Sequence, residues 1–122
     1  MTLLIAGLVL ALAAQAHPAP SAKVDIVAVG GCLKDTAPET WMLVDASDPV
    51  VSPNANAPAP KELASIAKSG KNQYRLTGVT VFDLSSHRGH SVVIKGLLNK
   101  DSPFSRLNMT SLTMVAAECP AK

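Results

Sequence analysis

The chain begins with an apolar run and then alternates between short apolar stretches and polar or Pro-rich segments. Val24 to Leu33 is rich in β-branched residues, and its Gly30-Gly31 pair is typical of a bend or a close backbone approach, which predicts a first strand. Lys34 to Thr40 is polar and is expected to be a loop. Trp41 to Ala46 is apolar enough to predict a second strand, partly buried on both faces.

Residues 47–60 are dominated by Pro, Ala and Asn, which predicts a long surface loop. A short helix is expected to begin at Pro60, with Glu62 near its positive end, Lys68 near its negative end and Gly70 as its stop. The apolar face of this helix, expected to cover the core as a lid, consists of Leu63, Ile66 and Ala67.

In the second half of the chain, the alternation of apolar and polar residues shifts by one position at two places. In residues 74–81 the apolar residues occupy even-numbered positions before Gly78 and odd-numbered positions after it, which indicates a bulge or sharp bend in a strand. The last predicted strand, residues 107–116, slips register around Thr110-Ser111 in the same way. Strands that change face midway are typical of small barrels, because barrels turn corners at such points.

Between these two strands, Asp83 to Arg88 is predicted to form a helical turn capped by Asp83, with Gly89 as its left-handed stop. Ser91 to Leu98 follows as the fourth strand. The resulting order predicts an all-β fold, a five-stranded OB-type Greek-key barrel with a helix between strands 3 and 4. A small immunoglobulin-like sandwich is the alternative, and the helical turn and the two phase changes favour the barrel.

Several stretches of the chain resemble a family. Residues 84–96 (LSSHRGHSVVIKG), residues 107–115 (LNMTSLTMV) and the terminal Cys119 resemble the second half of small exported bacterial OB-fold-like proteins of uncharacterised function. Similarity to the first half of these proteins lies in Gly31 to Leu33, Trp41 to Leu43 and Tyr74 to Leu76. The resemblance covers most of the mature chain and implies the fold. It brings no catalytic residue with it.

The apolar run at the start, Leu3 to Ala14, has the length of a secretory h-region. It is closed by Ala14-Gln15-Ala16, a small-residue pattern that signal peptidase accepts, so cleavage is expected before His17. The expected organisation is a signal peptide at 1–16, a flexible tail at 17–23 and a single OB-like domain at 24–120. We therefore expect a periplasmic or secreted protein with no membrane span once the leader is removed.

Export would place the two cysteines, Cys32 and Cys119, in an oxidising compartment, where a single disulfide between them is expected. Such a bond would close a loop of roughly 88 residues and stabilise the fold by about 4–5 kcal/mol. Lipidation is an alternative, because Val29 to Cys32 resembles a lipobox, although Lys23 and Asp25 interrupt the apolar run that a lipobox needs. A reactive or metal-binding cysteine pair is a further alternative.

Eleven basic and nine acidic residues give a formal charge of +2 and are scattered without a run of like sign. This balance argues against nucleic acid or anionic lipid as the main ligand. Trp41, Tyr74 and Phe82 fall on strand positions where burial is the rule, so the stacking platforms of a polynucleotide binder are not expected. The basic residues expected to stand as ordinary solvated charges on the barrel are Arg75, Lys95 and Arg106.

Three histidines, His17, His87 and His90, are candidate ligands for copper or zinc. His87 and His90 lie three residues apart without a nearby third ligand, and His17 would offer its free amine and imidazole after cleavage. The neighbouring hydroxyls of Ser85 and Ser86 lack an identifiable orienting acid, so neither an enzymatic activity nor a cofactor is expected.

These patterns favour a non-enzymatic module of the bacterial envelope that binds a protein, peptide or glycan surface. OB-folds usually take ligands between two loops, which here are residues 34–40 and 99–106. The residues expected to contact the ligand are Phe104, Arg106, Trp41 and Arg75. The chief rival hypothesis is a periplasmic copper- or zinc-binding protein that uses the three histidines, and a weaker one is an oligonucleotide-binding OB domain.

Overall fold

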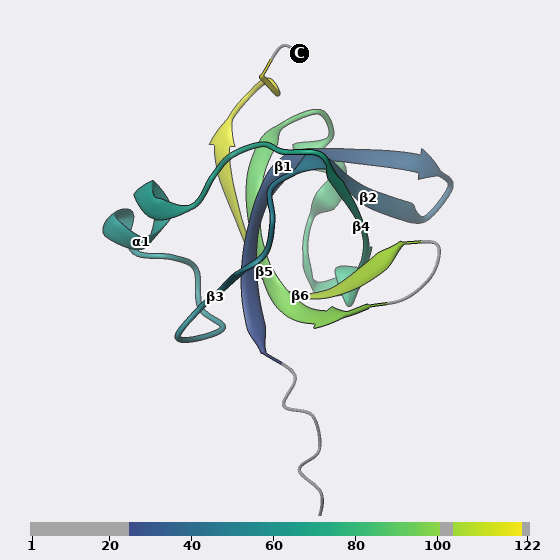
Figure 1. Ribbon diagram of the computed structural model, residues 1–122. Coiled ribbons are helices and arrows are strands. Elements are labelled where there is room, and N and C mark those ends of the chain that lie inside the picture. Colours follow the sequence, from purple (N-terminus) through teal and green to yellow (C-terminus); the bar gives the residue numbers. More distant parts are fainter. Residues whose placement is uncertain (1–24, 101–103, 121–122) are drawn as a thin grey trace, which may run out of the picture.

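The computed structural model describes residues 25–100 and 104–120, and these residues form one six-stranded sheet with short helices (Figure 1). The strands are β1 (Ile26–Ala37), β2 (Thr40–Ala46), β3 (Val50–Val51), β4 (Asn72–Thr77), β5 (Ser91–Asn99) and β6 (Ser105–Ala116). The helices are α1 (Pro60–Ser65) and two 3-10 turns, η1 (Val79–Val81) and η2 (Leu84–His87). The predicted all-β class is confirmed.

Five of these strands are paired in a closed ring. The sheet order is β2-β4-β6-β5-β1-β3, and β1 also pairs with β2, so each of β1, β2, β4, β6 and β5 has a partner on both sides. The pairing of β4 with β6 is parallel, and the other pairings are antiparallel. The short strand β3 pairs with β1 at Val27 and Ala28, outside the ring.

The first strand is longer than the sequence pattern indicates. Residues 34–37 were expected in a polar loop, but β1 continues through them and pairs with β2, for example at Lys34 with Met42 and Asp35 with Trp41. The hairpin turn is therefore only Pro38 and Glu39, and Glu39 adopts a left-handed conformation with φ of 58°. A polar stretch can form a strand when its backbone N–H and C=O groups are hydrogen-bonded to a neighbouring strand and its side chains face solvent.

Helix α1 begins at Pro60 as predicted but ends at Ser65, because Ile66 is already extended (φ −94°, ψ 125°). Gly70 is therefore not its stop. Lys68 still binds carbonyls at this end, since its Nζ donates to Leu63 O in the helix at 2.7 Å and to Ile66 O just after it. Ile66 is buried against Ala28 and Val93, so the segment covers the outer face of β1 and β5.

Both predicted phase changes coincide with irregularities of the backbone. After Gly78, whose φ is 69°, the chain leaves β4 and forms η1, so the bend is confirmed but the strand does not continue beyond it. In β6, Lys95 pairs with Ser111 whereas Gly96 pairs with Met109, which leaves Thr110 as the extra residue of a bulge. The register slip predicted in the last strand is therefore confirmed.

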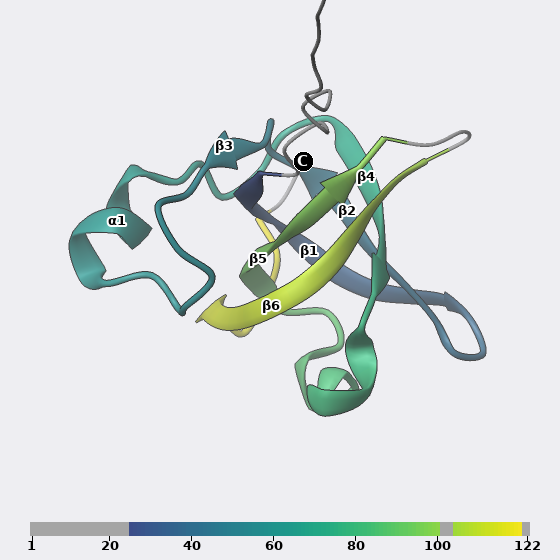
Figure 2. The same cartoon turned by 90° about the horizontal axis from the view of Figure 1, so that it is seen from below.

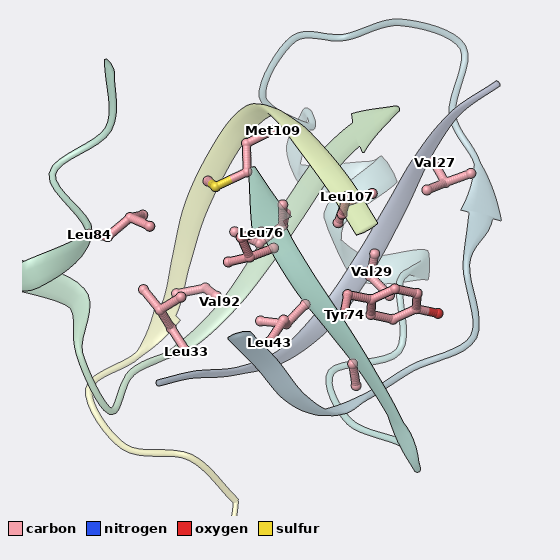
Figure 3. Packing of buried hydrophobic residues seen from close by; sticks show 12 residues of the cluster. Val27, Val29, Leu33, Leu43, Tyr74, Leu76, Leu84, Val92, Leu107 and Met109 are labelled. Carbon is pink, nitrogen blue, oxygen red and sulfur yellow. The ribbon is translucent and has the colours of Figure 1, made fainter. Parts of the chain in front are cut away.

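The main core fills the inside of the strand ring (Figure 3). Alternate residues of the paired strands point into it, and the side chains of Leu33, Leu43, Ile94 and Leu107 are fully buried. The core consists of Val27, Val29, Leu33, Leu43, Ala46, Tyr74, Leu76, Leu84, Val92, Ile94, Leu107 and Met109. Burial of these side chains is the main stabilising contribution to the fold.

Lys95 is buried on the outer face of β5, contrary to the expectation that it is solvated. Its Nζ donates to Glu62 Oε1 at 2.9 Å and to the backbone oxygen of Asn54 at 3.3 Å, and Ser52 Oγ donates to Glu62 Oε2 at 2.7 Å. The hydrogen bond from Lys95, followed by that from Ser52, lowers the pKa of Glu62. The Pro-rich segment and α1 fold over β5 and supply this carboxylate, which the sequence pattern does not indicate.

Cys32 in β1 and Cys119 after β6 form the predicted disulfide, with 5.6 Å between their Cα atoms. Among the described residues, no helix has the length and apolar character needed to cross a membrane. The predicted signal peptide, the tail at 17–23 and His17 lie outside the described residues.

Candidate functional site

A row of basic residues crosses the outward face of four neighbouring strands. Arg75 on β4 pairs with Arg106 on β6 and with Met42 on β2, and Met42 pairs in turn with Lys34 on β1. Paired residues place their side chains on the same face of a sheet, and Leu107, the next residue after Arg106, lies in the core. The row therefore points outward, and its three basic residues are exposed while Met42 is buried.

The spacing of the row concentrates positive charge. Neighbouring strands lie about 4.8 Å apart, so the backbones of Lys34 and Arg106 fall within about 15 Å of each other. Arg75 and Arg106 are register partners in the parallel pairing of β4 with β6, so two positive side chains stand side by side on the same face. Within the described part of the chain, neither Lys34 nor Arg75 takes part in an ion pair. This arrangement favours the binding of a negatively charged group across the row.

Next to this row is an open groove of about 570 Å³. Gln73, which shares the outward face of β4 with Arg75, forms part of its wall, so the groove and the row are continuous. Phe104 also lines it and is 42% exposed. Two further lysines line the groove, Lys71 and Lys100. We call this surface the basic face; it consists of Lys34, Met42, Lys71, Gln73, Arg75, Lys100, Phe104 and Arg106.

The basic face lies between two projecting parts of the sheet. In both views, the hairpin that joins β1 to β2 and the adjoining ends of β5 and β6 lie on the same side of the molecule, opposite α1 (Figures 1 and 2). The hairpin between β1 and β2 and the adjoining ends of β5 and β6 belong to the two regions expected to take the ligand, and β2 and β4 lie between them (Figures 1 and 2).

Hydrogen bonds fix the floor of the groove to the start of the Pro-rich segment. Asn72 Nδ2 donates to Asp48 Oδ1 at 2.8 Å and to the backbone oxygen of Ser47 at 3.1 Å. The hydroxyl of Tyr74 donates to the same backbone oxygen at 3.2 Å. Burial raises the pKa of Tyr74, which keeps this hydroxyl protonated. Asp48 is the acidic residue that lines the groove, and its bond with Asn72 holds it at the rim.

Trp41 does not join the other three residues expected to contact a ligand. It packs against the main core, and the guanidinium of Arg88 lies 5.4 Å from its ring centroid. Arg88 also donates to both carboxylate oxygens of Asp35, at 3.0 and 2.8 Å. This bidentate pair lowers the pKa of Asp35 and raises that of Arg88. Phe104, Arg106 and Arg75 do lie together on the basic face.

His87 and His90 are close to each other. Their Nδ1 atoms are 3.2 Å apart, and their rings meet edge to face with centroids 5.3 Å apart. Gly89 lies between them in the left-handed conformation, with φ of 82°, as predicted. Within the described residues, no group of three or more His, Cys, Asp or Glu side chains is arranged to hold a metal ion. The third predicted ligand, His17, lies outside them.

The serine hydroxyls beside His87 are engaged elsewhere. Ser85 Oγ donates to Asp83 Oδ1 at 3.3 Å, and Ser86 Oγ donates to the backbone oxygen of Asp83 at 3.0 Å. Both hydroxyls therefore stabilise the turn. Cys32 is buried inside β1 and bonded to Cys119, which differs from a lipobox cysteine, since that residue becomes a lipidated amino terminus.

Comparisons with known protein families, with curated proteins and with solved structures found no match to this chain. The candidate site therefore depends on the geometry alone. Sequence reasoning did not name Lys34, Met42, Lys71, Gln73 or Lys100 as contacts, although Lys34 and Lys100 fall in the two loop regions expected to take the ligand. The register of β1, β2 and β4 brings Lys34 and Met42 beside Arg75, and the groove is lined further by Lys71, just before β4, and Lys100, just after β5. A register prediction for β1, β2 and β4 would have been needed to find Lys34 and Met42.

Proposed function

We propose that this protein is an exported, non-enzymatic binding module of the bacterial envelope, and that its basic face binds acidic groups on a protein, peptide or glycan. The observation that carries the proposal is the cross-strand row in which Arg75 stands between Arg106 and Met42, with Lys34 beyond. Neighbouring positive charges on one exposed face attract an anionic group.

We further propose that the strand ring is an OB-type Greek-key barrel. Three features support this assignment: the ring order β1-β2-β4-β6-β5, the parallel pairing of β4 with β6, and the helical turns between β4 and β5. In OB-folds the face of the second and third strands and the two flanking loops bind the ligand. In this chain those strands are β2 and β4, which carry the centre of the basic face.

The balance of charge and aromatic surface favours an acidic protein, peptide or glycan over a nucleic acid. Single-stranded nucleic acids are held largely by bases that stack on exposed aromatic side chains. Of the four aromatic residues, Tyr74 is buried and Trp41 and Phe82 are half-buried, so Phe104 alone is exposed. The basic face therefore offers several positive charges but only one stacking platform.

Export and a non-enzymatic role are supported by separate observations. The apolar leader with its Ala14-Gln15-Ala16 pattern and the disulfide suit an oxidising compartment outside the cytosol. The hydroxyls of Ser85 and Ser86 bind Asp83 in the turn, so neither is paired with His87 as a nucleophile would be with its base.

The proposal is tested by measuring binding to three polyanions, poly-L-glutamate, heparin and oligo-dT, with wild-type protein and two charge reversals. Arg75→Glu changes the centre of the basic face, and Lys61→Glu makes the same change of charge on exposed α1, on the opposite side of the molecule (Figure 1). We expect salt-sensitive binding to poly-L-glutamate or heparin that Arg75→Glu weakens by about tenfold or more and Lys61→Glu leaves within about twofold.

Arg75→Glu is expected to fold, because it places opposite charges at the pair formed with Arg106. Equal effects of the two reversals would contradict the proposal, because they would show that net charge and not the basic face governs binding. Failure to bind poly-L-glutamate and heparin would contradict it as well. Tighter binding of oligo-dT, lost in Phe104→Ala, would replace the proposed partner with a polynucleotide.

A further inference from the structure

Two imidazole rings meet at the end of η2, and neither residue belongs to the basic face. The Nδ1 atoms of His87 and His90 face each other at 3.2 Å. Both histidines are only partly buried. Neither ring is needed for the core, and the binding function proposed above does not use them.

The backbone around the two histidines is fixed on several sides. His90 N donates to His87 O at 3.0 Å, which closes the turn around Gly89. Leu33 N donates to His90 O at 3.1 Å, and Gly89 N donates to Leu33 O at 2.8 Å, so the turn is bound to β1. Cys119 Sγ also lies 3.2 Å from Gly89 O. The two rings are therefore held by a pre-organised turn, which lowers the entropic cost of binding a shared ligand.

The spacing of the two nitrogens suits a metal ion. Two nitrogens bound at 2.0–2.1 Å to one tetrahedral ion lie about 3.3 Å apart, close to the separation seen here. Imidazole nitrogen is a preferred ligand of zinc and copper. Without a metal, the Nδ1–H of one imidazole can donate to the Nδ1 of the other at this distance. A metal ion bound between the two nitrogens would replace this hydrogen bond.

We propose that His87 and His90 form a two-histidine site for a divalent transition-metal ion, Zn²⁺ or Cu²⁺, bound through both Nδ1 atoms. Among the described residues no third His, Cys, Asp or Glu completes the site, so the remaining positions are taken by water or by an external ligand. Cu²⁺ binds more tightly than Zn²⁺, as is general for nitrogen sites. The proposal is independent of the basic face.

The test is a titration of the exported, oxidised protein with Zn²⁺ and with Cu²⁺, followed by calorimetry. We expect one ion per chain, with His87→Ala and His90→Ala each weakening binding by about tenfold or more. His17→Ala is the matched control, because it removes a histidine outside the proposed site, and it should leave Zn²⁺ affinity within about twofold. Arg75→Glu should likewise leave metal binding unchanged while it weakens binding to polyanions.

Nitrogen-15 NMR of the histidine rings in wild-type protein gives a readout that does not depend on the variants folding. Zn²⁺ should shift the Nδ1 resonances of His87 and His90, and in the metal-bound protein both Nε2 atoms should carry the ring proton. Loss of binding in His17→Ala with normal binding in His87→Ala would overturn the proposal, because the metal would then be held at the amino terminus. Absence of saturable binding, or ring shifts confined to His17, would also overturn it.

Discussion

Reduction of the Cys32–Cys119 disulfide should remove a large share of the stability of this fold. The two cysteines are 87 residues apart, so the bond closes most of the described chain into one loop. In the chain-entropy model a loop of about 88 residues corresponds to about 15 cal/mol/K of lost denatured-state entropy, or about 4.6 kcal/mol at about 25 °C. Net stabilities of small domains are about 5–15 kcal/mol, so reduction should leave the protein marginally stable.

Urea denaturation with and without dithiothreitol measures this effect. With a slope of about 1–3 kcal/mol/M, the midpoint should fall by about 1.5–4.6 M on reduction. The Cys32→Ser, Cys119→Ser double variant should show the same low midpoint and should not respond to dithiothreitol. An unchanged midpoint on reduction of the wild-type protein, with both thiols then accessible to labelling, would refute the argument that the bond constrains the unfolded chain.

Three further substitutions test the packing of the fold by urea denaturation. Lys95 lowers the pKa of Glu62, so the ionised carboxylate stabilises the fold above its ordinary pKa of 4.5, and this stabilisation is lost as pH falls below that value. Glu62→Gln should therefore lower stability near neutral pH and make stability decline less steeply in acid, and an unaltered pH profile of stability would contradict this. Gly30→Ala should cost about 1–3 kcal/mol, because its Cβ would overlap the backbone of Ala67, and a neutral effect would show that this segment moves freely. Leu107→Ala should cost about 2–5 kcal/mol because Leu107 is 0% exposed, and a cost below about 1 kcal/mol would contradict its place in the core.

Local patterns in the sequence predicted much of the strand order. The phase change at Thr110 marked a real bulge, and Gly78 marked a real bend, because an inserted residue or a left-handed glycine moves the apolar side chains to the other face. The extension of β1 through Lys34 was missed, because a polar strand held by backbone pairing has no apolar period.

The parts that could not be predicted depend on contacts between distant residues. The environment of Lys95 is set by Glu62, which is 33 residues away and reaches β5 only because the Pro-rich segment folds over it. Likewise, the charges scattered along the chain gather into the basic face through the register of Lys34, Arg75 and Arg106. A single sequence contains no local signal for either arrangement.

The most direct test of the basic face as a binding surface is an amide NMR titration of the isotope-labelled protein with poly-L-glutamate. The account predicts that shift changes concentrate on Lys34, Gln73, Arg75 and Arg106 and on the residues that line the groove, and that α1 and β3 remain unaffected. Changes spread evenly over all exposed lysines and arginines, or centred on α1, would contradict it.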